Sequence, residues 1–339
     1  MSQQQFQDDL QAYFQFLMAI LQTISESDGD AEVVYPLFAA NTDKLNSILA
    51  EMLRFWAKSC FEEAQADTVK SIAGVIFDFG NLILQFSWGD KASNMEIAVA
   101  SYETILQVYT KQAFPQDWAM TQNNLANAYR NRIKGDKASN IENAIFFCKA
   151  ALQIYTQQAF PQENMGILFN LGMLYQDEGR FNAAFNTYES AIATIELLRG
   201  EIISGEETKR KQAEEWNQLY RNMVEVCLQL QEETLALEYI ERSKTRNLVE
   251  LLFNDELYPK GEIPAEVTQQ LQQLRKQIAA EKQRLEQAEE NNLDINRSNL
   301  NQLRQQREDL ISKIIGFKPI RFPEIKNLLD KNTAIVEWY

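Results

Sequence analysis

The sequence predicts an all-α protein, a right-handed α-solenoid of stacked helix pairs, and three observations support this fold class. The 339 residues include only 12 Gly and 7 Pro, so long stretches are free of helix breakers. The run GDKASN begins at Gly89 and again at Gly135, and the run QAFPQ begins at Gln112 and again at Gln158. Both runs recur after 46 residues, a period typical of repeat arrays. Hydrophobic residues make up 45% of the chain, enough for a sizeable core.

The net charge of −15 narrows the range of partners. Nucleic acids and anionic membrane surfaces are excluded, because binding to either depends on Lys and Arg. We expect a protein or peptide partner that is basic or neutral. Residues 1–70 hold 11 acidic and 4 basic residues, so much of the excess lies there. A solubilising surface explains that excess more simply than a docking patch for a basic partner does.

Cysteine usage and hydropathy predict a soluble cytoplasmic protein. Cys60, Cys148 and Cys227 have no C-x-x-C spacing and lie in apolar helical patterns, as buried thiols in a reducing compartment would. The most apolar early run, from Tyr13 to Ile24, contains Gln15 and Gln22 and is too short to span a bilayer.

Residues 69–258 are expected to form about four helix pairs, two of them of the 46-residue type. Small and large side chains in these pairs follow the tetratricopeptide repeat (TPR) pattern, with small residues where the two helices cross and large ones beside them. The four copies carry, in order, Phe79, Gly80, Ile83, Ala98, Tyr102 and Ile105; Leu125, Ala126, Tyr129, Ala144, Cys148 and Ala151; Leu171, Gly172, Tyr175, Ala184, Tyr188 and Ala191; and, more weakly, Met223, Val224, Cys227, Ala236, Ile240 and Ser243.

Residues 1–68 do not repeat, and we expect them to be a helical cap on the first end of the array. Helices are predicted near residues 5–25 and 42–64. Pro36 is expected to break the chain between them, and the run Asn41-Thr42-Asp43 is typical of a helix N-terminus.

Residues 259–316 change in character, because heptad-like apolar residues alternate with charged ones. The first run contains Val267, Leu271, Leu274, Ile278 and Leu285, and the second contains Leu300, Leu303, Leu310 and Ile314. An antiparallel helical hairpin is the simplest interpretation. A dimeric coiled coil is the alternative, and it is less favoured because each run is barely three heptads long. The oligomeric state stays open.

The last residues, Ala334 to Tyr339, read as a β-strand, AIVEWY. A strand of this kind is not stable by itself. We therefore expect residues 317–339 to be a short β stub that begins another domain.

Several runs together resemble the front of a TPR protein fused to a CHAT domain, a type common in cyanobacteria. These are WAMTQNNLANAYRNRIKGDKASNIENAI, the QAFPQ runs, ERSKTRNLVELL from Glu241 to Leu252, the hairpin and AIVEWY. The resemblance implies a downstream caspase-like cysteine protease with a His and Cys dyad. This chain contains no histidine, so we expect no dyad and no enzyme activity from it. The absence of histidine would be explained if the protease domain was trimmed from this chain, is encoded by a separate gene, or has decayed.

The candidate partner-binding residues lie on the first helix of each pair, which in TPR arrays lines the concave face. Amide side chains there can pair with both the N–H and the C=O of a bound peptide. Asn81 and Asn127 occupy equivalent places, as do Asn124 and Asn170, and NNLA runs also occur in the repeats of kinesin light chains. The alternative is that the asparagines bond between helices and set the stacking. The groove candidates are Asn81, Asn123, Asn127, Arg130 and Asn170.

No cofactor or metal site is predicted. The GDKASN loops have one glycine each and favour a turn with a helix N-cap over a phosphate-binding loop. Carboxylate pairs such as Glu62-Glu63 lack a second group at ligand spacing.

These expectations favour a protein-interaction scaffold or sensor that binds a polypeptide in the TPR groove and controls a downstream caspase-like protease. Two alternatives remain: the structural arm of a cysteine peptidase whose catalytic domain is missing here, and a stand-alone adaptor that oligomerises.

Overall fold

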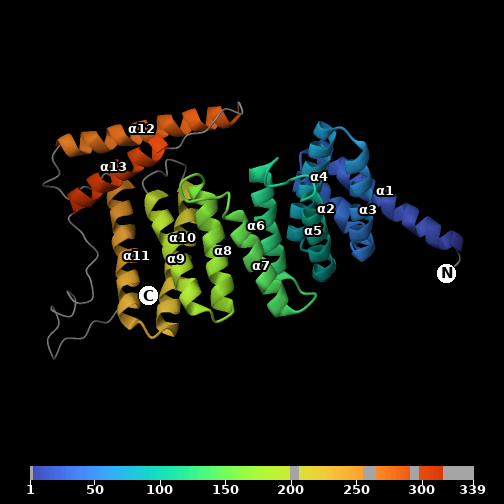
Figure 1. Ribbon diagram of the computed structural model, residues 1–339, viewed down its shortest axis with the longest axis horizontal. Helices are drawn as coiled ribbons and strands as arrows, with labels where there is room; N and C mark the ends of the chain where they lie inside the picture. The colour runs from blue at the N-terminus through green and yellow to red at the C-terminus, as the bar shows by residue number, and fades with distance from the viewer. Residues whose placement is uncertain (1–2, 199–205, 255–264, 291–297, 316–339) are drawn as a thin grey trace. The chain divides into compact units, whose positions relative to one another are not determined.

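The computed structural model describes residues 3–198, 206–254, 265–290 and 298–315, and every regular element in these ranges is helical (Figure 1). The helices are α1 (Gln3–Ser27), α2 (Ala31–Ala39), the short 3-10 helix η1 (Thr42–Lys44), α3 (Ser47–Glu63), α4 (Ala66–Gln85), α5 (Lys91–Ile105), α6 (Pro115–Asn131), α7 (Lys137–Ala151), α8 (Pro161–Asp177), α9 (Phe181–Leu198), α10 (Glu206–Gln229), α11 (Glu233–Asn254), α12 (Ala265–Glu290) and α13 (Ser298–Ile315).

The chain divides into two compact units, residues 1–155 and 156–339, and each is described by itself. In the first unit, α4 packs on α5 and α6 packs on α7, with α5 and α4 both against α6. In the second unit, α8 packs on α9, α10 packs on α11 and on α9, and α12 packs on α13. Neighbouring helix pairs are what the repeat period predicts, so the all-helical fold class is confirmed for the described residues. The predicted β-strand at 334–339 and the stub at 317–339 lie outside these residues.

The repeated GDKASN runs form a turn and a helix N-cap, as predicted. Gly89 and Gly135 have φ angles of 80° and 84°, a conformation that glycine adopts without steric cost. Asp90 then caps α5 and Asp136 caps α7, each carboxylate accepting from the backbone N–H of the serine three residues later. These hydrogen bonds measure 3.1 Å and 2.8 Å. The loop residues are therefore accounted for by chain reversal and helix initiation.

All the small and large positions assigned to the four copies are buried. Their side chains are matched in volume where the two helices of a pair cross. Gly80 lies under the ring of Tyr102, and Gly172 lies under the ring of Tyr188. In the second copy the same two places hold Ala126 and Cys148. A larger residue on one helix thus accompanies a smaller one on the other, as close packing requires.

Helix α3 packs against the outer side of α5, which explains a difference between the two 46-residue copies. Ile97 and Ala100 of α5 are fully buried. The equivalent residues of α7 are Asn143 and Phe146, and Phe146 is 64% exposed. The small and apolar residues on this side of α5 are therefore explained by its contact with α3. Among the described helices of the first unit, none packs in this way against the equivalent side of α7.

The N-terminal region differs from its prediction in two respects. Pro36 does not break the chain but lies inside α2, an unpredicted helix. The ring of Phe38 on α2 packs 5.8 Å from that of Phe79 and 5.3 Å from that of Phe86, and these contacts hold the short helix in place. The predicted helix start at residues 41–43 is also wrong. That segment is η1, and α3 begins after its N-cap, Asn46, whose side chain accepts from the N–H of Ile48 at 2.9 Å.

Helices α12 and α13 pack together through the heptad residues. Ile278, Leu285 and Leu300 form a buried cluster against which Leu303 packs. The apolar seam is thus covered within one chain, the arrangement that the hairpin interpretation describes.

Two further expectations concern thiols and membranes. Cys148 and Cys227 are buried as predicted, whereas Cys60 is only half-buried. None of the described helices is long and apolar enough to cross a membrane.

Candidate functional site

The candidate residues of the first unit lie on two neighbouring helices, α4 and α6. Asn81 is on α4, whereas Asn123, Asn127 and Arg130 follow each other along α6 at spacings of one helical turn. All of them are half-buried. The three residues of α6 form a row along the helix that borders Ala126, which is buried. We call this surface the α4–α6 face.

Asn81 is engaged in hydrogen bonds between helices. Its Oδ1 accepts from the hydroxyl of Tyr102 on α5 at 2.8 Å and from the amide of Asn124 on α6 at 2.9 Å. The Tyr102 hydroxyl group belongs to a fully buried side chain, and burial raises the pKa of that phenol well above its usual value. Asn81 therefore joins three helices, which agrees with the stacking alternative for this residue.

Asn123 is in a different situation. Its Oδ1 is buried and has no hydrogen-bond partner among the described residues. The neighbouring copies place Phe77 and Phe169 at the equivalent position, and these rings lie 6.0 Å from Tyr102 and 6.2 Å from Tyr188. The middle copy thus replaces an aromatic pair by an asparagine and Cys148. An amide in an aromatic position indicates a role other than filling the core.

Asn127 and Arg130 complete the stripe on α6. The backbone carbonyl of Asn127 accepts from the side-chain amide of Asn131 at 2.9 Å. Burial raises the pKa of the Cys148 thiol to about 12, while the positive charge of Arg130 acts in the opposite direction. That thiol stays protonated at neutral pH, so it is unsuited to nucleophilic chemistry.

Asn170 lies on α8 of the second unit and is half-buried. A network like that of Asn81 exists in this unit with other residues. The hydroxyl of Tyr188 donates to Oε1 of Gln176 at 2.9 Å and accepts from the amide of Asn222 at 3.2 Å. In both units a buried tyrosine of the second helix thus belongs to a hydrogen-bond network that includes polar side chains of two first helices.

Two ion pairs join the second helix of the first pair to its neighbours. Arg54 of α3 donates to Glu103 of α5 at 2.9 Å, and the hydroxyl of Tyr129 on α6 donates to the same carboxylate at 3.0 Å. Arg132, at the end of α6, donates to both oxygens of Glu96 on α5 at 2.7 Å. These groups connect α5 to α3 on one side and to α6 on the other.

The Glu96–Arg132 pair makes stability depend on pH. The hydrogen bonds from Arg132 lower the pKa of Glu96 below its usual value of 4.5, so the folded chain binds this proton less readily than the unfolded chain does. The stabilisation is therefore complete above about pH 4.5 and is lost as the pH falls through the lower pKa of the folded state. We expect Glu96→Gln to lower the melting temperature at pH 7 by about 2 °C and by less at pH 3. An equal loss at both pH values in calorimetry would contradict this prediction.

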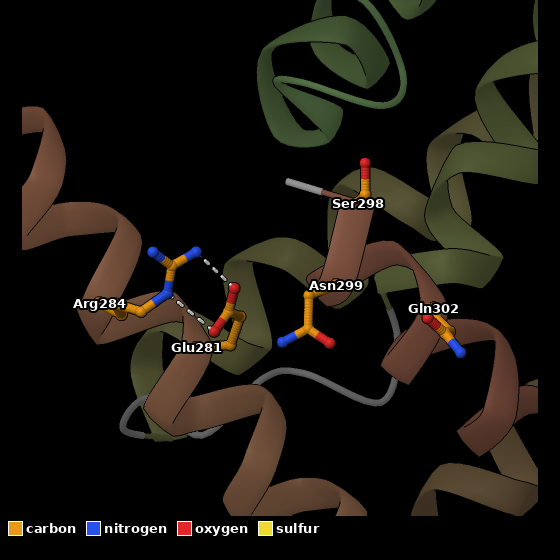
Figure 2. Close-up of a pocket in the computed structure, with 5 residues that line it drawn as sticks. All are labelled: Glu281, Arg284, Ser298, Asn299 and Gln302. Carbon is orange, nitrogen blue, oxygen red and sulfur yellow. Dashed lines mark hydrogen bonds and ion pairs between the residues drawn. The ribbon is translucent and has the colours of Figure 1, made fainter. Parts of the chain in front are cut away.

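Figure 2 shows a shallow pocket between α12 and α13, with a volume of about 460 Å³. It is lined by Glu281, Arg284, Ser298, Asn299 and Gln302. Arg284 donates to both oxygens of Glu281, at 2.7 Å and 3.0 Å, so the two charges at the rim neutralise each other. The pocket offers no unbalanced charge to a ligand, and the α4–α6 face is the better candidate.

The sequence analysis missed two residues that matter at this face. Tyr102 was assigned to packing, yet its hydroxyl orients Asn81. Asp78, one turn before Asn81 on α4, is a half-buried carboxylate. The 46-residue period could have found it, because it occupies the place of Asn124 and Asn170. In the parts of the chain that the structure describes, no three carboxylate or cysteine side chains are grouped so that they could hold a metal ion.

Comparison with known proteins gives little. No family model matches the chain, and no curated protein does. Nine chains of solved structures match, among them that of "Crystal structure of BtubC (BKLC) from P. vanneervenii". That chain is 16% identical, and the match covers 75% of this chain and 96% of the other with a TM-score of 0.38. A TM-score this low does not establish a shared fold.

Proposed function

We propose that this chain is a protein-interaction scaffold that binds an extended polypeptide segment on the α4–α6 face. The observation that carries the proposal is the buried carbonyl oxygen of Asn123, which has no hydrogen-bond partner among the described residues. Leaving such an acceptor unsatisfied costs free energy, and that cost would be removed if the half-buried side chain turned toward a donor on a bound segment. Asparagine suits this task because one amide can pair with both the N–H and the C=O of a peptide.

The repeat type that we propose is the TPR. Its support is the burial of every small and large position of the pattern and the matched pairs Gly80–Tyr102 and Gly172–Tyr188. Stacked helix pairs of this kind present extended surfaces that suit elongated partners. The groove is thus a property of several pairs together rather than of one.

We propose a binding function and no catalysis for this chain, since it contains no histidine and its two buried thiols have raised pKa values. We also propose a cytoplasmic location, which suits free thiols. The resemblance to TPR–CHAT proteins suggests the consequence of binding, which is control of a downstream caspase-like protease. The buried seam of the α12–α13 hairpin favours this scaffold over an adaptor that oligomerises through its hairpin.

The binding proposal is tested with a library of random extended peptides. Peptides are selected on the wild-type chain, and their dissociation constants are measured by fluorescence anisotropy for the wild type and for an Asn123→Ala/Asn127→Ala variant. We expect the double variant to bind roughly tenfold more weakly or worse, because central polar contacts of an interface cost more than about 1 kcal/mol each when removed. Unchanged affinity would refute the α4–α6 face as the binding surface.

The regulatory part has its own test in the protein expressed from its native gene. If that protein has proteolytic activity, deletion of residues 69–253 should change how it responds to the selected peptides. Identical proteolysis with and without these residues would refute regulation while leaving binding intact.

A further inference from the structure

Asp78 is an acid next to the α4–α6 face, and no cation among the described residues balances its charge. It lies one turn before Asn81 on α4 and is half-buried. No described residue forms a hydrogen bond or an ion pair with it. Burial raises the pKa of its carboxyl group, and the negative charge of Asp28, at the end of α1, raises it further.

The 46-residue period relates Asp78 to an uncharged residue in the next copy. The equivalent residue of the next copy, Asn124, points its amide at the preceding first helix and donates to Asn81 at 2.9 Å. The side chain of Asp78 likewise points toward the preceding element, which here is the end of α1. A Cβ placed on Gly29, just after α1, would lie 3.7 Å from the Cβ of Asp78. A neutral amide therefore fits this place in the repeat. The first copy has instead a carboxylate that faces another carboxylate.

A second group reports the same electrostatic environment. Burial raises the pKa of Tyr109 to about 12, and Asp117 and then Asp78 add to that effect. Asp78 and Asp117 thus both act on Tyr109, and Asp28 acts on Asp78. A cation close to Tyr109 is Lys70 of α4, whose ammonium group lies 5.1 Å from the ring of Phe114, which packs against that tyrosine. Arg130 lies more than three turns beyond Asp117 on α6.

We propose that the α4–α6 face binds an extended polypeptide through a Lys or Arg side chain that pairs with Asp78. This inference rests on the proposed function and adds the chemistry of the partner. Charge complementarity supports it, because a cation at Asp78 would relieve both the desolvation of that carboxylate and its repulsion from Asp28. The net charge of −15 would also speed the approach of a basic segment.

The test uses three synthetic peptides taken from one selected binder, which carry Lys, Gln or Glu at a single position. Their dissociation constants are measured on the wild type, on Asp78→Asn and on Glu62→Gln. Glu62 is an exposed acid of α3 and serves as the control for net charge. We expect the Lys peptide to bind the wild type roughly tenfold tighter than the Gln peptide, and Asp78→Asn to abolish that difference. Glu62→Gln should preserve it.

Stability is measured on the same variants. We expect Asp78→Asn to melt at the same temperature as the wild type or higher at pH 7, because Asn is the residue of the equivalent place in α6 and carries no charge to desolvate. A charge exchange gives an independent check, since Asp78→Lys should prefer the Glu peptide.

The outcomes separate the two proposals. If the Lys and Gln peptides bind the wild type equally while Asn123→Ala/Asn127→Ala weakens both, the face binds peptides but does not select a cation, and the inference is overturned. If no peptide binds the wild type, both proposals are overturned. A Lys preference that survives in Asp78→Asn also overturns the role of Asp78.

Discussion

Replacing Gly172 by leucine is expected to destabilise the second unit by about 1–3 kcal/mol or more, the cost typical of overpacking a core. Even one carbon at this position would overlap the ring atoms Cε1 and Cδ1 of Tyr188. The ring cannot move freely, because its hydroxyl is held by Gln176 and Asn222. The side chain therefore has to separate α8 from α9 or break these hydrogen bonds. Urea unfolding and hydrogen exchange of α8 and α9 would measure the loss.

The chain offers a matched control on the same helix. Apart from the neighbouring backbone of α8 itself, no described atom lies within 4 Å of the place where a Cβ on Gly166 would be. Gly166→Ala should therefore stabilise the helix by roughly 0.5–1 kcal/mol, the usual gain for this change in a helix interior. Combining Gly172→Ala with Tyr188→Cys recreates the Ala126–Cys148 pair and should recover part of the loss. If Gly172→Ala alone leaves stability unchanged, the ring of Tyr188 can move aside at no cost, and the overpacking prediction is wrong.

The repeat positions were predictable because they depend on local spacing. The 46-residue period locates Gly80, Ala126 and Gly172 at the same point of three helix pairs, and stacking buries each of them in the same way. The N-terminal region has no such period. There α2 continues through Pro36 because Phe38 packs on Phe79 and Phe86, contacts that span more than forty residues of sequence. Tertiary packing overrides a local helix-breaking signal in this case.

The true start of α3 was hidden for a similar reason. Both Asn41 and Asn46 are suitable N-caps by residue type. Asn46 is the cap, and its amide also donates to the hydroxyl of Tyr13 on α1 at 2.6 Å. This long-range hydrogen bond favours one of two locally equivalent residues, and no local pattern reveals it.

The candidate site was predictable as a set of positions but not as a set of contacts. Equivalence in the repeat placed Asn81 and Asn127 together as candidates. Whether an asparagine faces a partner or another helix depends on neighbours such as Tyr102 and Asn124, which only the folded chain brings to Asn81. The same period relates Asp78 to Asn124. Whether the charge of Asp78 is balanced, however, depends on the residues that follow α1, which only the fold brings beside it.

Asn81→Ala is expected to cost about 1–3 kcal/mol, since it leaves the buried hydroxyl of Tyr102 and the amide of Asn124 without their shared acceptor. Removing the hydroxyl as well, in Asn81→Ala/Tyr102→Phe, should cost less than the two single changes added together, because fewer polar groups remain unsatisfied. Asn123→Ala should change stability by no more than about 0.5 kcal/mol, as its Oδ1 has no partner to lose. Denaturant unfolding of the four variants measures these differences. A cost for Asn123→Ala as large as that for Asn81→Ala would make Asn123 a stacking residue, and the partner-binding role of this face would then lose its main support.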